Sequence, residues 1–171
     1  CAGLLGFAKL GPPVADDVVL SEVVGRACSL VRPMYRERGH ELKSQVQPSL
    51  RVRGNSILLD QIFVNLLVNA AEASREPIHV LLECEPLPRG AKDEPARVRI
   101  SVSDDGPGVP PSLRESIFHP FFTTHTDGSG LGLTTAREAA RDMGGDLFLE
   151  PTERGARFVA VLLGGESREP R

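Results

Sequence analysis

The stretch Asn65-Leu66-Leu67-Val68-Asn69-Ala70-Ala71-Glu72 decides how the rest of this 171-residue chain is interpreted. It ends a run whose apolar residues recur with helical period, namely Ile57, Leu58, Ile62, Phe63, Leu66, Leu67 and Ala70. Asn65 and Asn69 share one face of this helix, and Glu72 lies on the same side. Asparagine is unfavourable inside a helix, so two of them need a reason. Exposure to solvent is one reason; the binding of Mg²⁺ through side-chain oxygens is the other.

A second cluster, Asp104-Asp105-Gly106-Pro107-Gly108, follows a strand predicted over residues 97–103. A carboxylate held at a strand end can accept a hydrogen bond from an exocyclic amine such as the adenine N6 group. The glycines would let the backbone turn tightly and approach a base. The alternative is an ordinary turn, because Asp-Gly and Pro-Gly are common turn dipeptides.

A third cluster, Gly128-Ser129-Gly130-Leu131-Gly132-Leu133, stands where a helix is predicted to begin, over residues 131–143. Glycines before a helix expose amide groups and the positive end of the helix dipole to phosphate oxygens. The spacing matches neither the P-loop nor the dinucleotide fingerprint. Phosphate binding here would proceed without a P-loop lysine, and the alternative is a plain glycine-rich loop.

Further helices, loops and strands are predicted in the rest of the chain. A helix is predicted from an N-cap at Ser21 to Gly39, Asn55 is predicted to cap the central helix, and Gly144-Gly145 ends the last one.

Residues 86–95 are predicted to form a loop, and residues 104–130 look largely irregular. Residues 1–14 are interpreted as a helix end and linker, and residues 164–171 as a polar tail. The strands are expected at 42–46, 50–53, 78–84, 97–103, 147–150 and 156–163.

Bulk properties limit the classes of function. The length fits one compact domain, and a net charge of −3 gives no reason to expect a nucleic acid or an anionic membrane as partner. No apolar run approaches the roughly 18 residues of a membrane span. The three cysteines lack metal-ligand spacing, which favours a reducing compartment. Because the chain begins with Cys1 rather than Met, we expect a piece of a larger protein.

The order of the clusters resembles a known family. An asparagine-bearing helix, D-x-G-x-G, the Phe-rich segment Ile117-Phe118-His119-Pro120-Phe121-Phe122-Thr123-Thr124 and G-x-G-L-G-L are similar to the N, G1, F and G2 boxes of the GHKL (Bergerat-fold) superfamily. The F box is closest to that of sensor histidine kinases of the nitrogen-regulatory type. The resemblance implies an α/β (α+β) two-layer sandwich. Its mixed, largely antiparallel sheet would carry three helices on one face and a mobile ATP lid, with residues 15–163 as the catalytic domain.

The resemblance also implies roles for single residues. Asn69 is the expected Mg²⁺ ligand, Asp104 the adenine anchor, and Asn65 and His125 the catalytic residues. Phe118, Phe121 and Phe122 are expected to pack in the lid and core. The residues expected to bind ATP are Asn65, Asn69, Glu72, Asp104, Gly106, Gly108, Val109, Thr124, Gly128, Ser129, Gly130, Leu131, Gly132 and Leu133.

Two positions depart from the family pattern. Glu72 and His125 stand where many relatives carry lysine. Histidine neutralises phosphate charge only when it is protonated, so handling of the γ-phosphate could depend on pH. Arg114 and Arg137 are alternative partners for that phosphate.

The segment Gly39-His40-Glu41-Leu42-Lys43 superficially resembles the phosphoacceptor box of these kinases. It lacks the proline of that box, and His40 stands too near Asn65 to leave room for a second dimerisation helix. We therefore interpret His40 as the start of a strand, and His79 as a residue on a strand face.

The resemblance implies a kinase module that uses ATP and Mg²⁺. It would donate the γ-phosphoryl group to a histidine on a dimerisation (histidine-phosphotransfer) domain of the same parent, for relay to a response regulator. That parent is expected to be a homodimer, and this part of it cytoplasmic even where the parent is anchored in a membrane. One alternative is a Ser/Thr kinase of the anti-sigma-factor type, and another is a degenerate module that binds nucleotide only to change shape. Gyrase- and Hsp90-like ATPases resemble the fold but carry a glutamate where this chain has Asn65.

Overall fold

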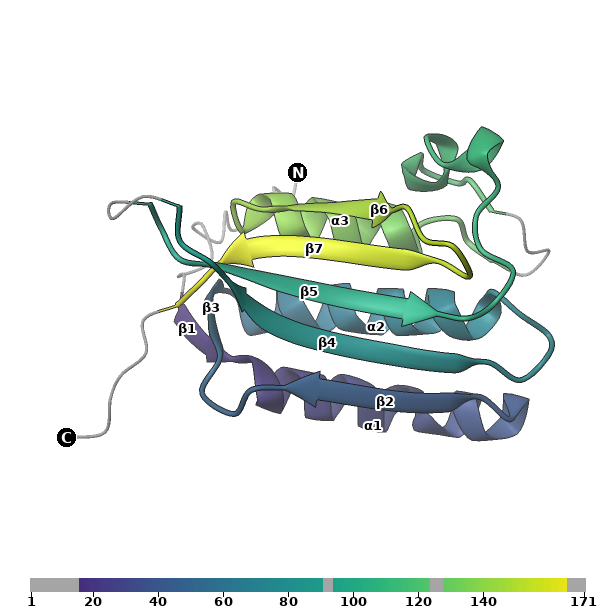
Figure 1. Ribbon diagram of the computed structural model, residues 1–171, viewed down its shortest axis with the longest axis horizontal. Coiled ribbons are helices and arrows are strands. Elements are labelled where there is room, and N and C mark those ends of the chain that lie inside the picture. Colours follow the sequence, from purple (N-terminus) through teal and green to yellow (C-terminus); the bar gives the residue numbers. More distant parts are fainter. Residues whose placement is uncertain (1–15, 91–93, 124–127, 166–171) are drawn as a thin grey trace, which may run out of the picture.

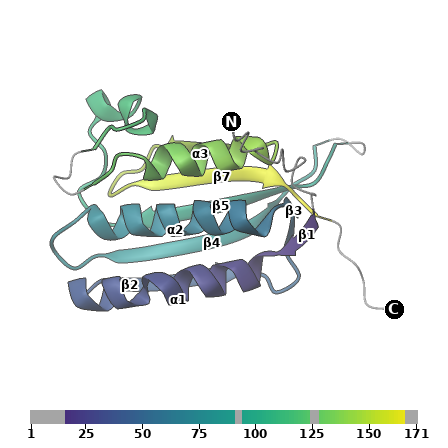
Figure 2. The same ribbon diagram turned by 180° about the vertical axis from the view of Figure 1, so that it is seen from behind.

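The computed structural model describes residues 16–90, 94–123 and 128–165. In these residues one face of a five-stranded sheet is covered by three helices, which makes two layers (Figures 1 and 2). The helices are α1 (Leu20–Arg38), α2 (Ser56–Glu72) and α3 (Gly132–Asp142). The predicted two-layer architecture is confirmed.

The sheet has the strand order β2-β4-β5-β7-β6. Only the β2–β4 pair is parallel, and the other three pairs are antiparallel, so the sheet is mixed and largely antiparallel as expected. Its strands are β2 (Glu41–Val46), β4 (His79–Leu87), β5 (Arg97–Asp104), β6 (Asp146–Glu150) and β7 (Arg157–Leu163). The strand β4 continues to Leu87, so it takes in two residues that the sequence assigned to a loop.

A second, two-stranded sheet lies beside the end of the larger one. It pairs β1 (Asp16–Val19) antiparallel with β3 (Arg51–Gly54). The sequence predicted the later of these strands but not its partner. The described chain continues past β7 to Gly165, whose N–H donates to the Arg51 carbonyl at 2.9 Å.

The helix α2 lies against the centre of the sheet because its apolar residues recur on a wide face. Asn55 caps it: the side-chain oxygen accepts from the N–H groups of Ile57 and Leu58 at 2.8 and 3.3 Å. Fully burying one large apolar side chain contributes about 1.5–3 kcal/mol. The buried set is Leu59, Ile62, Phe63, Leu66, Leu67, Ala70 and Ala71.

The helix α1 begins differently from the prediction. Ser21 was expected to be the N-cap, but the helix begins at Leu20 and Val19 precedes it without a side-chain cap. The Leu20 N–H donates instead to the Leu50 carbonyl at 3.0 Å, a partner from a distant segment. The predicted end is confirmed, since Gly39 follows the last turn with a left-handed φ of 71°.

Two short 3-10 helices, η1 (Pro111–Leu113) and η2 (Ser116–Phe118), interrupt the segment expected to be irregular. The helix end expected in residues 1–14 lies outside the described residues. Among those that are described, no helix has both the length and the apolar character that crossing a membrane requires.

Candidate functional site

The two asparagines of α2 lie one turn apart and are half-buried. Neither side chain makes a hydrogen bond within the described part of the chain. A Cβ added at Gly132, the first residue of α3, would lie 3.4 Å from the Asn65 side-chain oxygen. Two clusters that are far apart in the sequence therefore meet at Asn65, as the order of motifs predicted.

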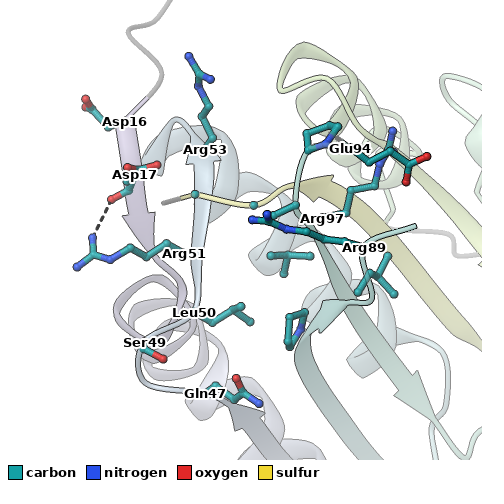
Figure 3. A pocket seen from close by; sticks show the side chains of 17 residues that line it. Asp16, Asp17, Gln47, Ser49, Leu50, Arg51, Arg53, Arg89, Glu94 and Arg97 are labelled. Atoms are coloured by element: carbon teal, nitrogen blue, oxygen red, sulfur yellow. Dashed lines mark hydrogen bonds between the residues drawn. The ribbon is translucent and has the colours of Figure 1, made fainter. Parts of the chain in front are cut away.

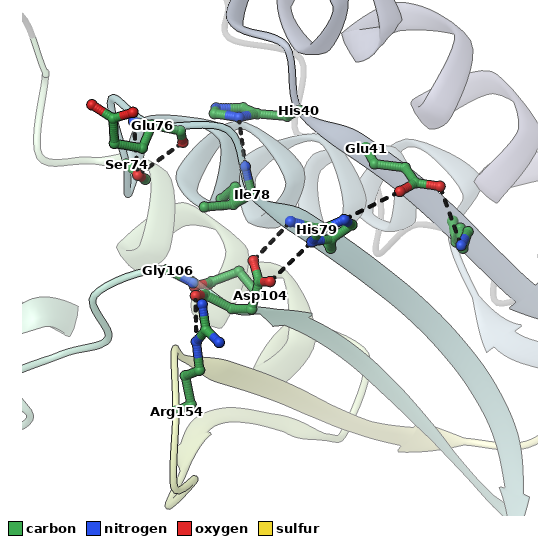
Figure 4. Close-up of polar contacts among 11 residues, drawn as sticks. His40, Glu41, Ser74, Glu76, Ile78, His79, Asp104, Gly106 and Arg154 are labelled. Carbon is green, nitrogen blue, oxygen red and sulfur yellow. Dashed lines mark hydrogen bonds and ion pairs between the residues drawn. The ribbon is translucent and has the colours of Figure 1, made fainter.

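Asp104 ends β5 and is buried, with 7% of its surface exposed (Figure 4). Its Oδ1 accepts from the N–H groups of Gly106 at 2.9 Å and Ala156 at 3.4 Å. Burial raises the pKa of this carboxyl, and the two N–H groups lower it by less. Its Oδ2 has no partner in the described residues, so one carboxylate oxygen is left to accept from a ligand.

The loop after Asp104 is held by a turn that the sequence did not connect with it. Gly155 lies in the β6–β7 turn with a left-handed φ of 69°, and a Cβ there would clash with the Asp104 carbonyl oxygen. A Cβ at Gly108 would in turn lie 2.6 Å from the Gly155 carbonyl. Arg154 adds a hydrogen bond from Nε to the Asp105 carbonyl at 3.1 Å. Only glycine fits these positions, since the two backbones touch.

His79, at the start of β4, fixes the same loop from the other side. Its N–H donates to Asp105 Oδ1 at 2.7 Å, and its Nδ1 lies 2.9 Å from Asp105 Oδ2 (Figure 4). The backbone hydrogen bond of His79 is the main cause that lowers the pKa of Asp105. His79 is mostly exposed, as predicted for a strand face, but no local pattern indicated its bond to Asp105.

The glycine-rich cluster leads into α3 as predicted. Gly130 has a left-handed φ of 67°, and its carbonyl accepts from the Phe121 N–H at 3.0 Å, which joins the Phe-rich segment to this loop. The Ser129 hydroxyl accepts from the Leu131 N–H at 3.3 Å. The Thr135 N–H donates to the carbonyl of Leu131, the residue that precedes α3, at 2.8 Å. The amides of Gly132, Leu133 and Thr134 are thus left at a helix N-terminus, where anions bind favourably.

The three phenylalanines behave differently from one another. Phe118 packs edge-on against Phe158, with ring centroids 6.2 Å apart, and Phe122 is partly buried against the core. Packing is confirmed for these two. Phe121 is 76% exposed and has a φ of 66°, so the expected packing is wrong for it in this state of the domain.

The two arginines proposed as phosphate partners have other contacts. Arg137 donates from Nε to Asp146 at 3.0 Å and lies 4.8 Å above the Phe118 ring. Arg114 makes a long bond of 3.5 Å to the Val109 carbonyl. Val109 and Leu133 are partly buried and Glu72 is half-buried. The predicted residues Thr124 and His125 lie outside the described residues.

The donor chemistry around Asn65 fits a magnesium–phosphate ligand. In the described part of the chain, no three His, Cys, Asp or Glu side chains gather as a self-sufficient metal site would need. Mg²⁺ bound to a nucleotide does not need one, because phosphates and waters supply most of its ligands. One or two neutral oxygens beside an amide-rich helix N-terminus are enough.

A large groove of about 1360 Å³ lies at the end of the sheet opposite Asp104 (Figure 3). It is next to Arg97, where β5 begins, whereas Asp104 is where β5 ends. Arg51, Arg53 and Arg89 line it together with Asp16 and Asp17. None of the predicted nucleotide residues that the structure describes lines it, so this groove is separate from the candidate nucleotide site.

The profile of one family matches residues 54–164, which is more than half of the chain and includes every cluster described above. The chain belongs to the histidine kinase-, DNA gyrase B- and HSP90-like ATPase family. Within it, the similar proteins are sensor histidine kinases, so this is a histidine kinase ATP-binding catalytic domain.

Three comparisons define the similarity of this kinase domain. The C4-dicarboxylate transport sensor protein DctB of Rhizobium meliloti is 34% identical over 91% of this chain and 24% of its own length. The nitrogen regulation protein NtrY of Azorhizobium caulinodans is 29% identical over 96% of this chain and 21% of its own. The solved catalytic domain of histidine kinase ThkA superposes with a TM-score of 0.76 at 30% identity, and the match covers 87% of this chain and 95% of that one. The chain thus spans about a quarter of the length of these two relatives.

Proposed function

We propose that this domain binds Mg²⁺–ATP between α2, the loop after β5 and the N-terminus of α3. One observation carries the proposal: Asp104 is buried, its Oδ1 is occupied by two backbone N–H groups, and its Oδ2 has no partner in the described residues. An acceptor in that setting matches the amino group of adenine, whereas the carbonyl of guanine would leave it unsatisfied.

The phosphates would lie where α2 meets α3. The amides of Gly132 and Leu133 and the positive end of α3 stabilise negative charge. Asn69 would hold Mg²⁺, with Asn65 beside it at the phosphates. A bound Mg²⁺ supplies neutralisation of phosphate charge. The role of His125 at the γ-phosphate stays a prediction.

The proposed reaction is phosphoryl transfer to a histidine on a separate dimerisation domain of the same parent protein. The bond between the γ-phosphorus and the β–γ bridging oxygen breaks, a bond from phosphorus to an imidazole nitrogen forms, and ADP leaves. An aspartate of a response regulator would take the phosphoryl group next. Asn65 cannot act as a base toward water, so hydrolysis lacks a contribution that is commonly about 10²–10⁴-fold.

The position of the domain in its parent is part of the proposal. Residues 15–163 form the catalytic unit, and residues 1–14 connect it to the dimerisation domain. We place the domain in the cytoplasm, where ATP is supplied, and expect the parent to be a homodimer.

Transfer to the parent's dimerisation domain tests the function directly. The purified chain, that domain and γ-labelled ATP are mixed, and the label is followed to protein and to free phosphate. We expect acid-labile, base-stable label on the dimerisation domain, and less of it with Asp104→Asn. Label released only as free phosphate would show an ATPase, and acid-stable label on serine or threonine would show a kinase of the other class.

A further inference from the structure

His40 is a buried histidine that the proposed reaction does not use. It follows Gly39 at the end of α1 and is 8% exposed. Its ring meets that of Tyr35 edge-on at 5.8 Å, and the Tyr35 hydroxyl donates to the Leu67 carbonyl of α2 at 2.8 Å. A group in this position is inaccessible to a transferred phosphoryl group.

Both ring nitrogens of His40 bind backbone groups, and these groups define its tautomer. Nε2 lies 2.9 Å from the Ala71 carbonyl, which only accepts, so Nε2 carries a hydrogen. The Ile78 N–H, which only donates, points to Nδ1 at 3.3 Å, so Nδ1 carries none. The ring is therefore neutral with its hydrogen on Nε2, and Figure 4 shows its hydrogen bond with Ile78.

The two residues that bind the His40 ring, Ala71 and Ile78, lie at the two ends of the connection between α2 and β4. Ala71 lies in the last turn of α2, two residues after Asn69, and Ile78 immediately precedes β4. His40 thus joins the asparagine-bearing helix to the strand whose first residue binds Asp105. The next backbone bond, from the Glu41 N–H to the Ile78 carbonyl at 2.9 Å, continues the same attachment.

The connection also forms a wall of the proposed nucleotide site. The Ser74 Cβ and the Ile78 Cγ2 each lie 3.8 Å from the position that a Cβ at Gly106 would take. Movement of Ile78 would therefore move the wall beside the Gly106 loop and the partner of Asp105 together.

We propose that His40 is a positioning residue for the nucleotide site. In its neutral, Nε2-protonated form it holds the α2–β4 connection where Ser74 and Ile78 border Gly106. The bond to the Ile78 N–H is the one that matters for nucleotide affinity. This inference rests on the proposed function only in taking the ligand beside Asp104 to be ATP.

Matched substitutions separate positioning from general stability. His40→Asn keeps an acceptor at the Nδ1 place, His40→Gln keeps a donor near the Nε2 place, and His40→Leu keeps neither. Tyr35→Phe is the control, because it removes a buried hydrogen bond from the same region without touching Ile78. Calorimetry gives the ATP dissociation constant of each variant at a temperature where thermal unfolding shows all of them folded.

We expect His40→Leu and His40→Gln to weaken ATP binding by about three- to tenfold, the equivalent of one hydrogen bond. His40→Asn should restore most of the affinity, and Tyr35→Phe should bind ATP like the wild type despite a lower melting temperature. Equal affinity in every folded variant overturns the inference, as does an equal loss in Tyr35→Phe. If the wild type itself fails to bind ATP, the proposed function fails first.

The tautomer provides an independent readout. Nitrogen NMR of the full chain should show His40 with a protonated Nε2 and an unprotonated Nδ1 that accepts a hydrogen bond. A His40 ring protonated on Nδ1 would contradict the assignment, whatever the binding data show.

Discussion

Asp104 and Asp105 are neighbours whose carboxyl groups are perturbed in opposite directions. Burial raises the pKa of Asp104, so the fold penalises its charge, whereas hydrogen bonds from His79 lower the pKa of Asp105. Folding favours the protonated form of Asp104. Its contribution to the free energy of unfolding is therefore fully present below the unfolded pKa and is lost as the pH rises through the higher folded pKa.

The prediction is a pair of opposite effects on stability. At pH 7, Asp104→Asn should raise the melting temperature, because it removes a buried charge, and Asp105→Asn should lower it. Both differences should shrink toward pH 3, where both carboxyl groups are increasingly protonated. Thermal unfolding at several pH values measures this. A lower melting temperature for Asp104→Asn at pH 7 would refute the assignment of its charge as costly.

The metal assignment is tested at Asn69. Asn69→Ala should reduce the dependence of ATP binding on Mg²⁺, because the only side-chain oxygen assigned to the metal is lost. Titration calorimetry with and without Mg²⁺ gives the difference for the variant and for Gln61→Ala, an exposed residue of the same helix. An unchanged Mg²⁺ dependence in Asn69→Ala removes this residue from the metal site.

At the scale of elements, the β6–β7 turn supports the loop after β5. Gly155 has a left-handed φ, and its Cα approaches the Asp104 backbone too closely for a side chain. The turn is further fixed by a hydrogen bond from the Thr152 hydroxyl to the Gly155 carbonyl at 3.0 Å. The position of Asp104 therefore depends on a hairpin about fifty residues later in the chain.

Gly155→Ala should lower the free energy of unfolding by clearly more than roughly 1 kcal/mol, because the added Cβ clashes with the Asp104 backbone. It should also weaken ATP binding. The control is Gly25→Ala in α1, where an added Cβ meets nothing within 4 Å. That change should stabilise the domain by about 0.5–1 kcal/mol. Chemical denaturation and calorimetry measure both effects, and a neutral Gly155→Ala would contradict the close packing.

At the scale of the whole molecule, ion pairs make the domain sensitive to acid. Arg137 and Arg141 of α3 both bind Asp146 of β6, and hydrogen bonding from Arg137 is the main cause that lowers the Asp146 pKa to about 2. A lowered folded pKa gives stability that is present above the unfolded value of about 3.9 and is lost as the pH falls toward 2. The effect is modest, because the Asp146 side chain is 44% exposed.

The free energy of unfolding should therefore fall between about pH 4 and pH 2, and Asp146→Asn should flatten that part of the profile. Urea denaturation across this pH range measures both. A wild-type profile that is flat below pH 4 would show that these pairs contribute nothing to the stability of the fold.

Local patterns predicted α2, its Asn55 cap, and most strands, because helical period, alternation and capping are carried by neighbouring residues. Local patterns gave wrong or missing predictions where the hydrogen-bond partner comes from a distant segment. Leu50 takes the place of a local N-cap for α1, and β1 finds β3. The glycine clusters predicted one site because their order matched a family, yet no local signal connected Gly155 to Asp104 or His40 to Ile78.

Asp104 is proposed to select ATP by accepting a hydrogen bond from the adenine amino group. Competition binding of ATP and GTP to the wild-type domain, in the presence of Mg²⁺, measures this selectivity. An unsatisfied buried acceptor costs about 1–3 kcal/mol, so ATP should be preferred by about tenfold or more. Asp104→Asn should lose most of that preference while the domain remains folded. Equal affinities of the wild type for the two nucleotides would contradict the account.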